Sequence, residues 1–236
     1  MTVSLAAAAL SLTLAASKPA TSPSPAVAAL VERCVVAYGG EAALAKMARS
    51  QIEGSVTSVV LRPGATGRIA RVYERPGKLR VEIAYAAGDG EIRVLDGGKG
   101  WRDGQPAEGP RLDAMVLQAA RLDLPALLRA SHRLRDGGTA EVGGRTVRLV
   151  AVEPRRGLLV EAAIDLRSGR ILRSRAASTA GPMPLEFVTT YSEFRTVDGV
   201  LVPMREENWA NGQSTGVTTI EKVDFPETFP AETFRP

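Results

Sequence analysis

The stretch that most constrains the fold is residues 186–207, where apolar and polar side chains alternate on both sides of a turn. The alternation runs to Phe194 and resumes after Asp198 and Gly199. This pattern predicts an antiparallel hairpin, in which Gly199 supplies the positive φ of the turn. Pro203 lacks a backbone N–H group, so we expect the second strand to lie at an edge or to contain a bulge there.

The same alternation recurs along most of the chain, separated by turns that contain glycine or proline. Further strands are predicted at residues 51–61, 67–74, 78–84, 91–95, 100–102, 140–142, 146–152, 158–166, 170–177 and 216–225. Sequential hairpins favour an up-and-down antiparallel sheet, and a sheet of this many strands curls rather than staying flat.

Three segments show helical periodicity instead. Residues 25–39 and 40–49 precede the first strand, and Gly39 is predicted to cap the first of these helices. Residues 112–134 interrupt the strands, and Pro125 either ends one helix or starts a second. The apolar stripe of this insertion comprises Leu112, Met115, Val116, Ala119, Leu122, Leu127 and Leu128. We therefore predict an α+β fold, mainly antiparallel β, with helices covering the concave face of a curled sheet.

The N-terminal residues predict export. The apolar run at residues 3–16 is shorter than the ~20 residues of a membrane-spanning helix but matches the core of a secretory signal. Small residues at Thr13, Ala15 and Ser17 offer cleavage sites. We expect residues 1–25 to be a signal peptide and linker and residues 26–236 to be one domain. The alternative is a disordered alanine-rich tail.

Cys34 is the single cysteine, so no intramolecular disulfide can form. Glu32 and Arg33 stand where a lipid-anchoring cysteine is preceded by small residues, so the protein is not expected to be lipid-anchored. We interpret Cys34 as a small buried hydrophobic residue on a helix. The alternative is a reactive thiol.

The net charge of +4 is too mild to demand a nucleic-acid partner, and no aromatic stacking platform accompanies it. Five arginines could form a basic surface for acidic partners or lipid headgroups. They are Arg155, Arg156, Arg170, Arg173 and Arg175. The alternative is that they are the solvated side of strands.

The residues of common catalytic and metal sites are scarce. His132 is the single histidine, which excludes a two-histidine metal site and leaves one residue for any Ser-His-Asp arrangement. Neither a nucleophile elbow nor a phosphate-binding loop occurs, and the carboxylates are spread singly. We predict no metal, no cofactor and no enzymatic activity; a small hydrolase using Ser131 or His132 is the least favoured alternative.

Several short motifs together resemble a known family. They are Tyr38-Gly39-Gly40-Glu41, Arg75-Pro76-Gly77-Lys78-Leu79-Arg80-Val81-Glu82, Asp96-Gly97-Gly98-Lys99-Gly100-Trp101, Asp165-Leu166-x-Ser168-Gly169 and Tyr191-Ser192-x-Phe194-Arg195-x-Val197-Asp198-Gly199. In these motifs the chain resembles the outer-membrane lipoprotein-sorting proteins. The resemblance implies a half-open antiparallel β-barrel closed by helices, similar to LolA, LolB and the sensor domain of RseB. It also implies a periplasmic location and a cavity that shelters acyl chains, with Arg71, Arg80 or Arg93 as the latch arginine.

The predicted function is therefore a non-enzymatic periplasmic carrier or chaperone for a lipoprotein acyl group or another lipid. Membrane-associated envelope proteins are further expected partners, and the protein is expected to be a monomer. Because aromatic residues make up only 5% of the chain, the lining is predicted to be aliphatic. The candidate lining residues are Leu79, Val81, Ile83, Ile92, Val94, Trp101, Met115, Leu122, Leu127, Val160, Ile164, Phe187 and Tyr191. The alternative is a protein-interaction or sensor module with a solid interior, binding through a sheet edge or the arginine-rich face.

Overall fold

An antiparallel sheet forms the body of the protein in the computed structural model, which describes residues 23–59, 63–86, 88, 90–178 and 185–236. Within these residues the sheet has 13 strands, in the order β6-β5-β4-β3-β2-β1-β13-β12-β11-β10-β9-β8-β7. The strands of its first half are β1 (Arg49–Ser58), β2 (Thr66–Glu74), β3 (Lys78–Tyr85), β4 (Gly90–Asp96), β5 (Lys99–Arg102) and β6 (Gln105–Ala107). Those of its second half are β7 (Arg135–Val142), β8 (Arg145–Arg155), β9 (Leu158–Asp165), β10 (Ile171–Ser178), β11 (Leu185–Val197), β12 (Val200–Ala210) and β13 (Gln213–Asp224).

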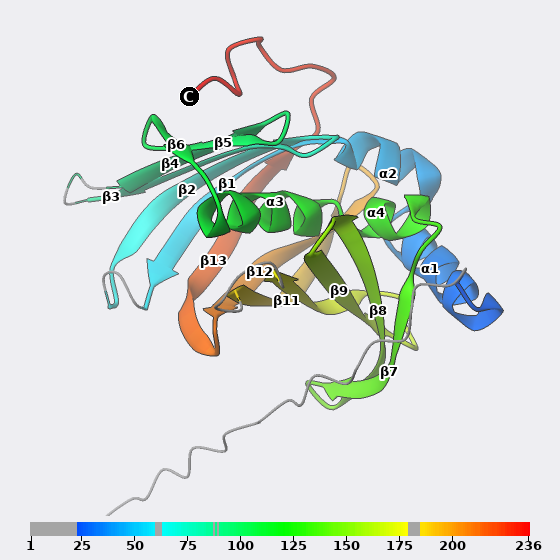
Figure 1. Ribbon diagram of the computed structural model, residues 1–236. Helices are drawn as coiled ribbons and strands as arrows, with labels where there is room; N and C mark the ends of the chain where they lie inside the picture. Colours follow the sequence, from blue (N-terminus) through cyan, green and yellow to red (C-terminus); the bar gives the residue numbers. More distant parts are fainter. Residues whose placement is uncertain (1–22, 60–62, 87, 89, 179–184) are drawn as a thin grey trace, which may run out of the picture.

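The order of the strands explains where the inserted helices lie. Strands β1 to β6 run outward to one edge of the sheet, whereas β7 to β13 run inward from the opposite edge until β13 pairs with β1. The chain must therefore cross the whole sheet between β6 and β7. It does so through α3 (Pro110–Leu122) and α4 (Leu124–Ala130). Figure 1 shows α3 between the β1–β5 part and the β9–β12 part of the curled sheet.

Helices α1 (Pro25–Ala37) and α2 (Gly40–Met47) lie with α4 at one end of the sheet (Figure 1). Ser24 caps α1, since its hydroxyl accepts a hydrogen bond from the backbone N–H of Val27 at 3.3 Å. The apolar face of α1 joins α4 and strands β8 to β10 in the largest hydrophobic cluster. Cys34 is buried in this cluster, and burial raises the pKa of its thiol to about 12.

The predicted hairpin is confirmed as β11 and β12, with Gly199 at φ 85° in the turn. Pro203 lies in the part of β12 that pairs with β11 alone, because the pairing of β12 with β13 begins only at Arg205. The strand is interior, but at Pro203 it is locally an edge, so the missing donor is tolerated.

The inserted segment forms two helices, and Pro125 stands in the first turn of α4, the second of the two predicted alternatives. Strand β7 begins five residues before the predicted start at residue 140, and β6 was not predicted at all. Both are edge strands, which pair on one side only. The predicted signal segment at residues 3–16 and the predicted end of the first strand at residues 60–61 lie outside the described residues.

Candidate functional site

A cavity of about 600 Å³ lies between the concave face of the sheet and α3. Its volume is in the range of ligand-binding pockets. Helix α3 contributes one stripe to the lining, made of Ala114, Leu117, Gln118 and Arg121. The strands supply the other lining residues: Val56, Ser58, Ile69, Arg71, Ile83, Tyr85, Gly90, Glu91, Arg93, Arg102, Ala176, Phe187, Thr189, Asn208, Trp209, Ala210, Thr215, Gly216 and Thr218.

The lining is mixed rather than aliphatic, which corrects the expected hydrocarbon wall. Two aromatic side chains contribute to it, from Tyr85 and Phe187, although aromatic residues are rare in the chain. Ile69, Ile83 and other aliphatic residues share the wall with arginines and a glutamate. The cavity can therefore hold a ligand with both apolar and charged parts.

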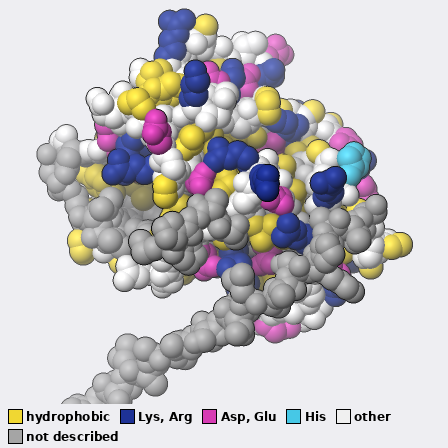
Figure 2. Space-filling model, viewed as in Figure 1, with side chains coloured by type: hydrophobic (Ala, Val, Ile, Leu, Met, Phe, Trp, Pro, Cys, Tyr) yellow, Lys and Arg dark blue, Asp and Glu magenta, His cyan; other side chains and the backbone are white. Residues whose placement is uncertain are grey.

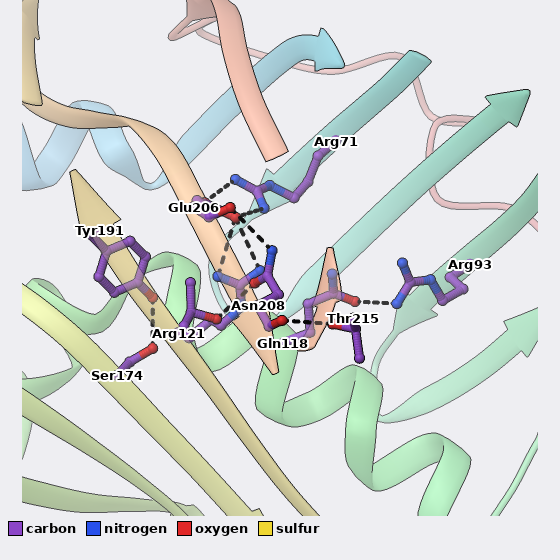
Figure 3. A network of polar contacts seen from close by, with 10 residues as sticks. Arg71, Arg93, Gln118, Arg121, Ser174, Tyr191, Glu206, Asn208 and Thr215 are labelled. Carbon is purple, nitrogen blue, oxygen red and sulfur yellow. Dashed lines mark hydrogen bonds and ion pairs between the residues drawn. The ribbon is translucent and has the colours of Figure 1, made fainter. Parts of the chain in front are cut away.

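A buried ion triad closes one side of this cavity (Figure 3). Glu206 of β12 accepts hydrogen bonds from Arg71 of β2 at 2.8 and 3.1 Å and from Arg121 of α3 at 3.3 and 3.4 Å. Their side chains are only 3% exposed for Glu206, 6% for Arg71 and 10% for Arg121. The triad thus ties α3 to the sheet from inside the molecule.

The electrostatics of the triad follow from its burial and its partners. Burial alone would raise the pKa of Glu206, but the charges of Arg71 and Arg121 and the hydrogen bonds from them lower this pKa to about 2. Glu206 is therefore a carboxylate at neutral pH. Two positive charges share its single negative charge.

A second triad borders the same cavity. Glu91 of β4 lies 3.2 Å from Arg93 Nε on the same strand and 2.6 Å from Arg102 Nη2 on β5. Arg93 also donates a hydrogen bond to Gln118 Oε1 of α3 at 2.9 Å, which is a second polar link between the helix and the sheet (Figure 3). Burial lowers the pKa of Arg93, with Glu91 opposing this effect.

A smaller cavity of about 90 Å³ lies on the other side of the first triad, and Arg71 and Arg121 line both spaces. Its lining includes Leu122, Tyr191 and residues of the β12 and β13 strands. The ion triad therefore stands between the large cavity and the small one.

Four of the predicted lining residues face these cavities. Ile83 and Phe187 line the large cavity, and Leu122 and Tyr191 line the small one. Six others pack in the hydrophobic clusters without lining either cavity: Leu79, Val81, Met115, Leu127, Val160 and Ile164. Met115 points away from the cavity because the curled sheet surrounds α3, so this helix buries more than one face.

The other three predicted residues, Ile92, Val94 and Trp101, lie on the convex face, which corrects their predicted place in the lining. Arg93 pairs with Val81 in the register, so Ile92 and Val94 point to the opposite side, and Trp101 pairs with Val94 there. Ile92 is 40% exposed, whereas Val94 is buried. The C-terminal segment packs against this outer face, where Arg80 donates a hydrogen bond to the backbone oxygen of Arg235 at 3.1 Å. Both faces of β4 therefore carry buried apolar residues, so the alternation of apolar and polar residues cannot show which face of this strand is concave.

Sequence reasoning missed most of the charged lining. Of the three arginines considered as a latch, Arg71 and Arg93 face the cavity and Arg80 faces outward. Arg71 shares the parity of Ile69 and Tyr73, which is a signal that could have placed it on the concave side. Its partner Glu206 lies on a strand that is distant in sequence, and no local pattern identifies that pairing.

Three of the five arginines of the predicted basic surface have a partner within the protein. Arg155 pairs with Asp113 and Arg175 with Glu186, while the guanidinium of Arg170 lies 5.3 Å from the centre of the Phe194 ring. On the face drawn in Figure 2, basic and acidic side chains are interspersed among hydrophobic ones. The described side chains drawn on that face form no continuous patch of one sign.

Neither Ser131 nor His132 lines either cavity, and His132 is exposed. In the described part of the chain, no group of three or more His, Cys, Asp or Glu residues is arranged to hold a metal ion. No described helix is both long enough and apolar enough to span a membrane.

Comparison with solved structures identifies the architecture. The chain is similar to a LolA superfamily protein from Nitrosomonas europaea, with a TM-score of 0.61 and 13% identity over 89% of this chain and 97% of that one. It is also similar to a DUF1329 family protein from Desulfovibrio piger, with a TM-score of 0.51 and 12% identity over 91% and 98% of the two chains. No protein-family model and no curated protein matches the sequence. The LolA-like fold, a curled and unclosed antiparallel sheet with helices, is therefore confirmed.

Proposed function

We propose that residues 26–236 act as one periplasmic carrier or chaperone domain, without enzymatic activity, which binds a lipoprotein acyl group or another lipid. The single observation that carries this proposal is the cavity of about 600 Å³ between the concave face of the sheet and α3. The fold shared with a LolA superfamily protein supports it. Residues 1–25 would then be the signal peptide and linker that direct export.

The apolar part of the lining gives the binding energy. Transfer of an acyl chain from water gains about 0.8 kcal/mol per methylene group, so a chain of about ten carbons gains about 8 kcal/mol before the cost of association. Ile69, Ile83 and Phe187 offer contact surface for such a chain. Removing water from the cavity desolvates the charged lining groups, which costs free energy. This cost is smaller than for isolated charges, because Glu206 and Glu91 are each paired with two arginines.

Entry of a long chain requires α3 to move relative to the sheet. Its polar links to the sheet inside the cavity are Arg121 with Glu206 and Gln118 with Arg93. Apolar residues of α3, among them Leu117 and Met115, belong to the hydrophobic clusters at the two sides of the helix, so movement of α3 also shifts these contacts. A carrier with this geometry would be opened by exchange of these contacts.

The experiment is lipid extraction of the purified protein followed by mass spectrometry, together with uptake of a fluorescent fatty acid. Ile83→Trp fills the large cavity and is expected to reduce uptake. Ile92→Trp is the matched control, because Ile92 is on the adjacent strand but on the opposite, partly exposed face. Absence of both co-purified lipid and uptake would contradict the carrier.

A second candidate function is that of an interaction or sensor module for envelope proteins. It is favoured by the two edges of the open sheet, since β6 pairs only with β5 and β7 only with β8 among the described strands. An unpaired strand edge can accept a further strand from a partner. This alternative gains if the lipid experiments are negative.

A further inference from the structure

The charges that line the large cavity do not balance. Four arginines line it, namely Arg71, Arg93, Arg102 and Arg121, and two carboxylates, Glu91 and Glu206, pair with them. A third carboxylate, that of Asp103, reaches Arg102 at 3.7 Å from an exposed turn. The cavity wall therefore carries an excess of positive charge.

The two triads are unequal in the donors that they leave free. Glu206 holds Arg71 in a two-pronged pair and also receives both terminal nitrogens of Arg121, so the first triad is closely tied. In the second triad, Arg93 Nε is buried and has no hydrogen-bond acceptor, although it lies 3.2 Å from Glu91. A buried N–H group without an acceptor lowers the stability of the protein. A ligand that supplies an acceptor at Arg93 would remove this cost.

The surroundings of Arg93 strengthen this requirement. Burial is the main cause that lowers the pKa of Arg93, and the positive charges of Arg71, Arg102 and Arg121 lower this pKa further. Arg102 borders the same space and is 47% exposed, so it lies at the rim. Glu91 pairs with both Arg93 and Arg102, so an anion at this rim would lie beside Glu91 and meet the donors of the two guanidinium groups that this carboxylate leaves free. The planar donors of these groups suit carboxylate and phosphate oxygens.

We propose that the cavity binds an anionic amphiphile, whose carboxylate or phosphate headgroup is held by Arg93 and Arg102 while its chain lies against Ile83 and Phe187. This inference rests on the proposed carrier function and specifies its ligand class. The arginines come from β4 and β5, whereas Phe187 comes from β11 in the other half of the sheet. The ligand is thereby oriented, with its headgroup toward the β4–β5 rim.

The test compares two probes with the same chain, dodecanoic acid and its methyl ester, in competition with a fluorescent fatty acid at neutral pH. A hydrogen-bonded charge pair predicts that the wild-type protein binds the carboxylate about tenfold to hundredfold more tightly than the ester. Arg93→Gln is expected to remove most of this preference, measured as the ratio of acid affinity to ester affinity within the same variant. Arg80→Gln is the matched control, because Arg80 is on the adjacent strand and faces outward, and it should keep the preference.

The outcomes separate this inference from the carrier function. Equal binding of acid and ester, or a preference retained in both Arg93→Gln and Arg102→Gln, overturns the anion site and leaves the carrier intact. Absence of binding by either probe overturns both. Arg102→Gln alters a half-exposed side chain and serves if Arg93→Gln fails to fold. Inorganic phosphate is the last probe, and competition by it as strong as that of dodecanoate would show a site for the free ion rather than for an amphiphile.

Discussion

Glu206 on β12 is bound by two nitrogens of Arg71 on β2, although β1 and β13 lie between these strands in the sheet. In a flat sheet, three inter-strand spacings of about 4.8 Å would separate β2 from β12 by about 14 Å. The contact at 2.8 Å is possible because the sheet curls, so that long side chains from distant strands meet on its concave side. The ion pair therefore reports directly on the curvature that forms the cavity.

Substitution of Glu206 by Gln is expected to destabilise the protein by about 3–5 kcal/mol, because it leaves two buried arginines without their counter-charge. The measurement is the free energy of unfolding in urea, followed by circular dichroism. Glu221→Gln is the control, since Glu221 forms a surface pair with Arg68, and its midpoint should not change. Equal midpoints for the two variants would contradict a structural role of the triad.

The stability of the protein is expected to fall in acid through Glu206. Its pKa is lowered to about 2 in the folded protein, whereas an unfolded glutamate titrates near about 4.3. The stabilising contribution is therefore complete above the unfolded pKa and is lost as the pH falls from about 5 to about 2, by about 3 kcal/mol in total. The free energy of unfolding, measured in urea at several pH values in this range, should fall more steeply with decreasing pH for the wild-type protein than for Glu206→Gln.

Comparison of these two proteins isolates Glu206 from the other acids. Asp165 also has its pKa lowered to about 2, where the hydrogen bonds from Ser168 and Arg145 outweigh burial, so it contributes in the same sense. Burial raises the pKa of Asp123 and of Glu161, which act in the opposite sense. All three remain in both proteins, so their effects cancel in the difference. Parallel pH profiles for the two proteins would contradict the assignment to Glu206.

Arg121→Gln is expected to loosen α3 while costing less stability than Glu206→Gln. The neutral pair of Arg71 and Glu206 survives this change, so the loss is that of hydrogen bonds to a charged group, about 1.5–3 kcal/mol. Hydrogen exchange followed by mass spectrometry should show faster exchange across residues 110–122. Arg111→Gln, on the exposed side of the same helix, should leave the exchange rates as they are.

Cys34 is expected to be unreactive in the folded protein. It is buried among the residues of the α1 and α4 cluster, and burial raises the pKa of its thiol to about 12. The thiolate is the reactive form, so a thiol reagent near neutral pH should not modify it until the protein unfolds. Since the chain has one cysteine, the extent of labelling reads out unfolding directly. Rapid labelling without denaturant would contradict the buried position.

The sequence allowed the strands to be predicted because alternation and turn residues are local properties. The hairpin around Gly199 is an example, since its two strands and its turn lie within a single stretch. The pairing of β1 with β13 joins residues near the two ends of the sheet-forming chain, and no local pattern specifies it. That pairing sets the order of the strands, and through it the meeting of Arg71 with Glu206.

The lining of the cavity was less predictable than the strands for a related reason. Parity identifies two faces of a strand, but it assigns the apolar face to the interior only when the other face meets solvent. On β4 the neighbours Val94 and Leu95 are both buried, because the outer face is covered too. Ile92 and Val94 were assigned to the cavity by their apolar character, whereas the residues that face it from this strand are the charged Glu91 and Arg93.

Two adjacent glycines, where the N-terminal helices meet the β11–β12 turn, allow the effect of close packing to be compared with the effect of backbone conformation. Gly39 and Gly40 both have positive φ, 105° and 79°, so alanine is strained at either position. A Cβ atom at Gly39 would lie 2.1 Å from the backbone oxygen of Gly199, whereas one at Gly40 would meet open space. We expect Gly40→Ala to cost about 1–2 kcal/mol for its left-handed conformation.

Gly39→Ala is likewise strained by its positive φ and, in addition, costs about 1–3 kcal/mol for overpacking. The added Cβ atom would lie 2.1 Å from the Gly199 oxygen and 2.7 Å from the Ala43 Cβ atom. The backbone contact from Leu201 N–H to the Tyr38 oxygen, at 3.3 Å, holds the two segments together and limits relaxation. Thermal unfolding of both variants measures the difference between them, to which the close approach of Gly39 to the Gly199 oxygen contributes most. If the two variants unfold at the same temperature, the helices do not dock on the β11–β12 turn as described.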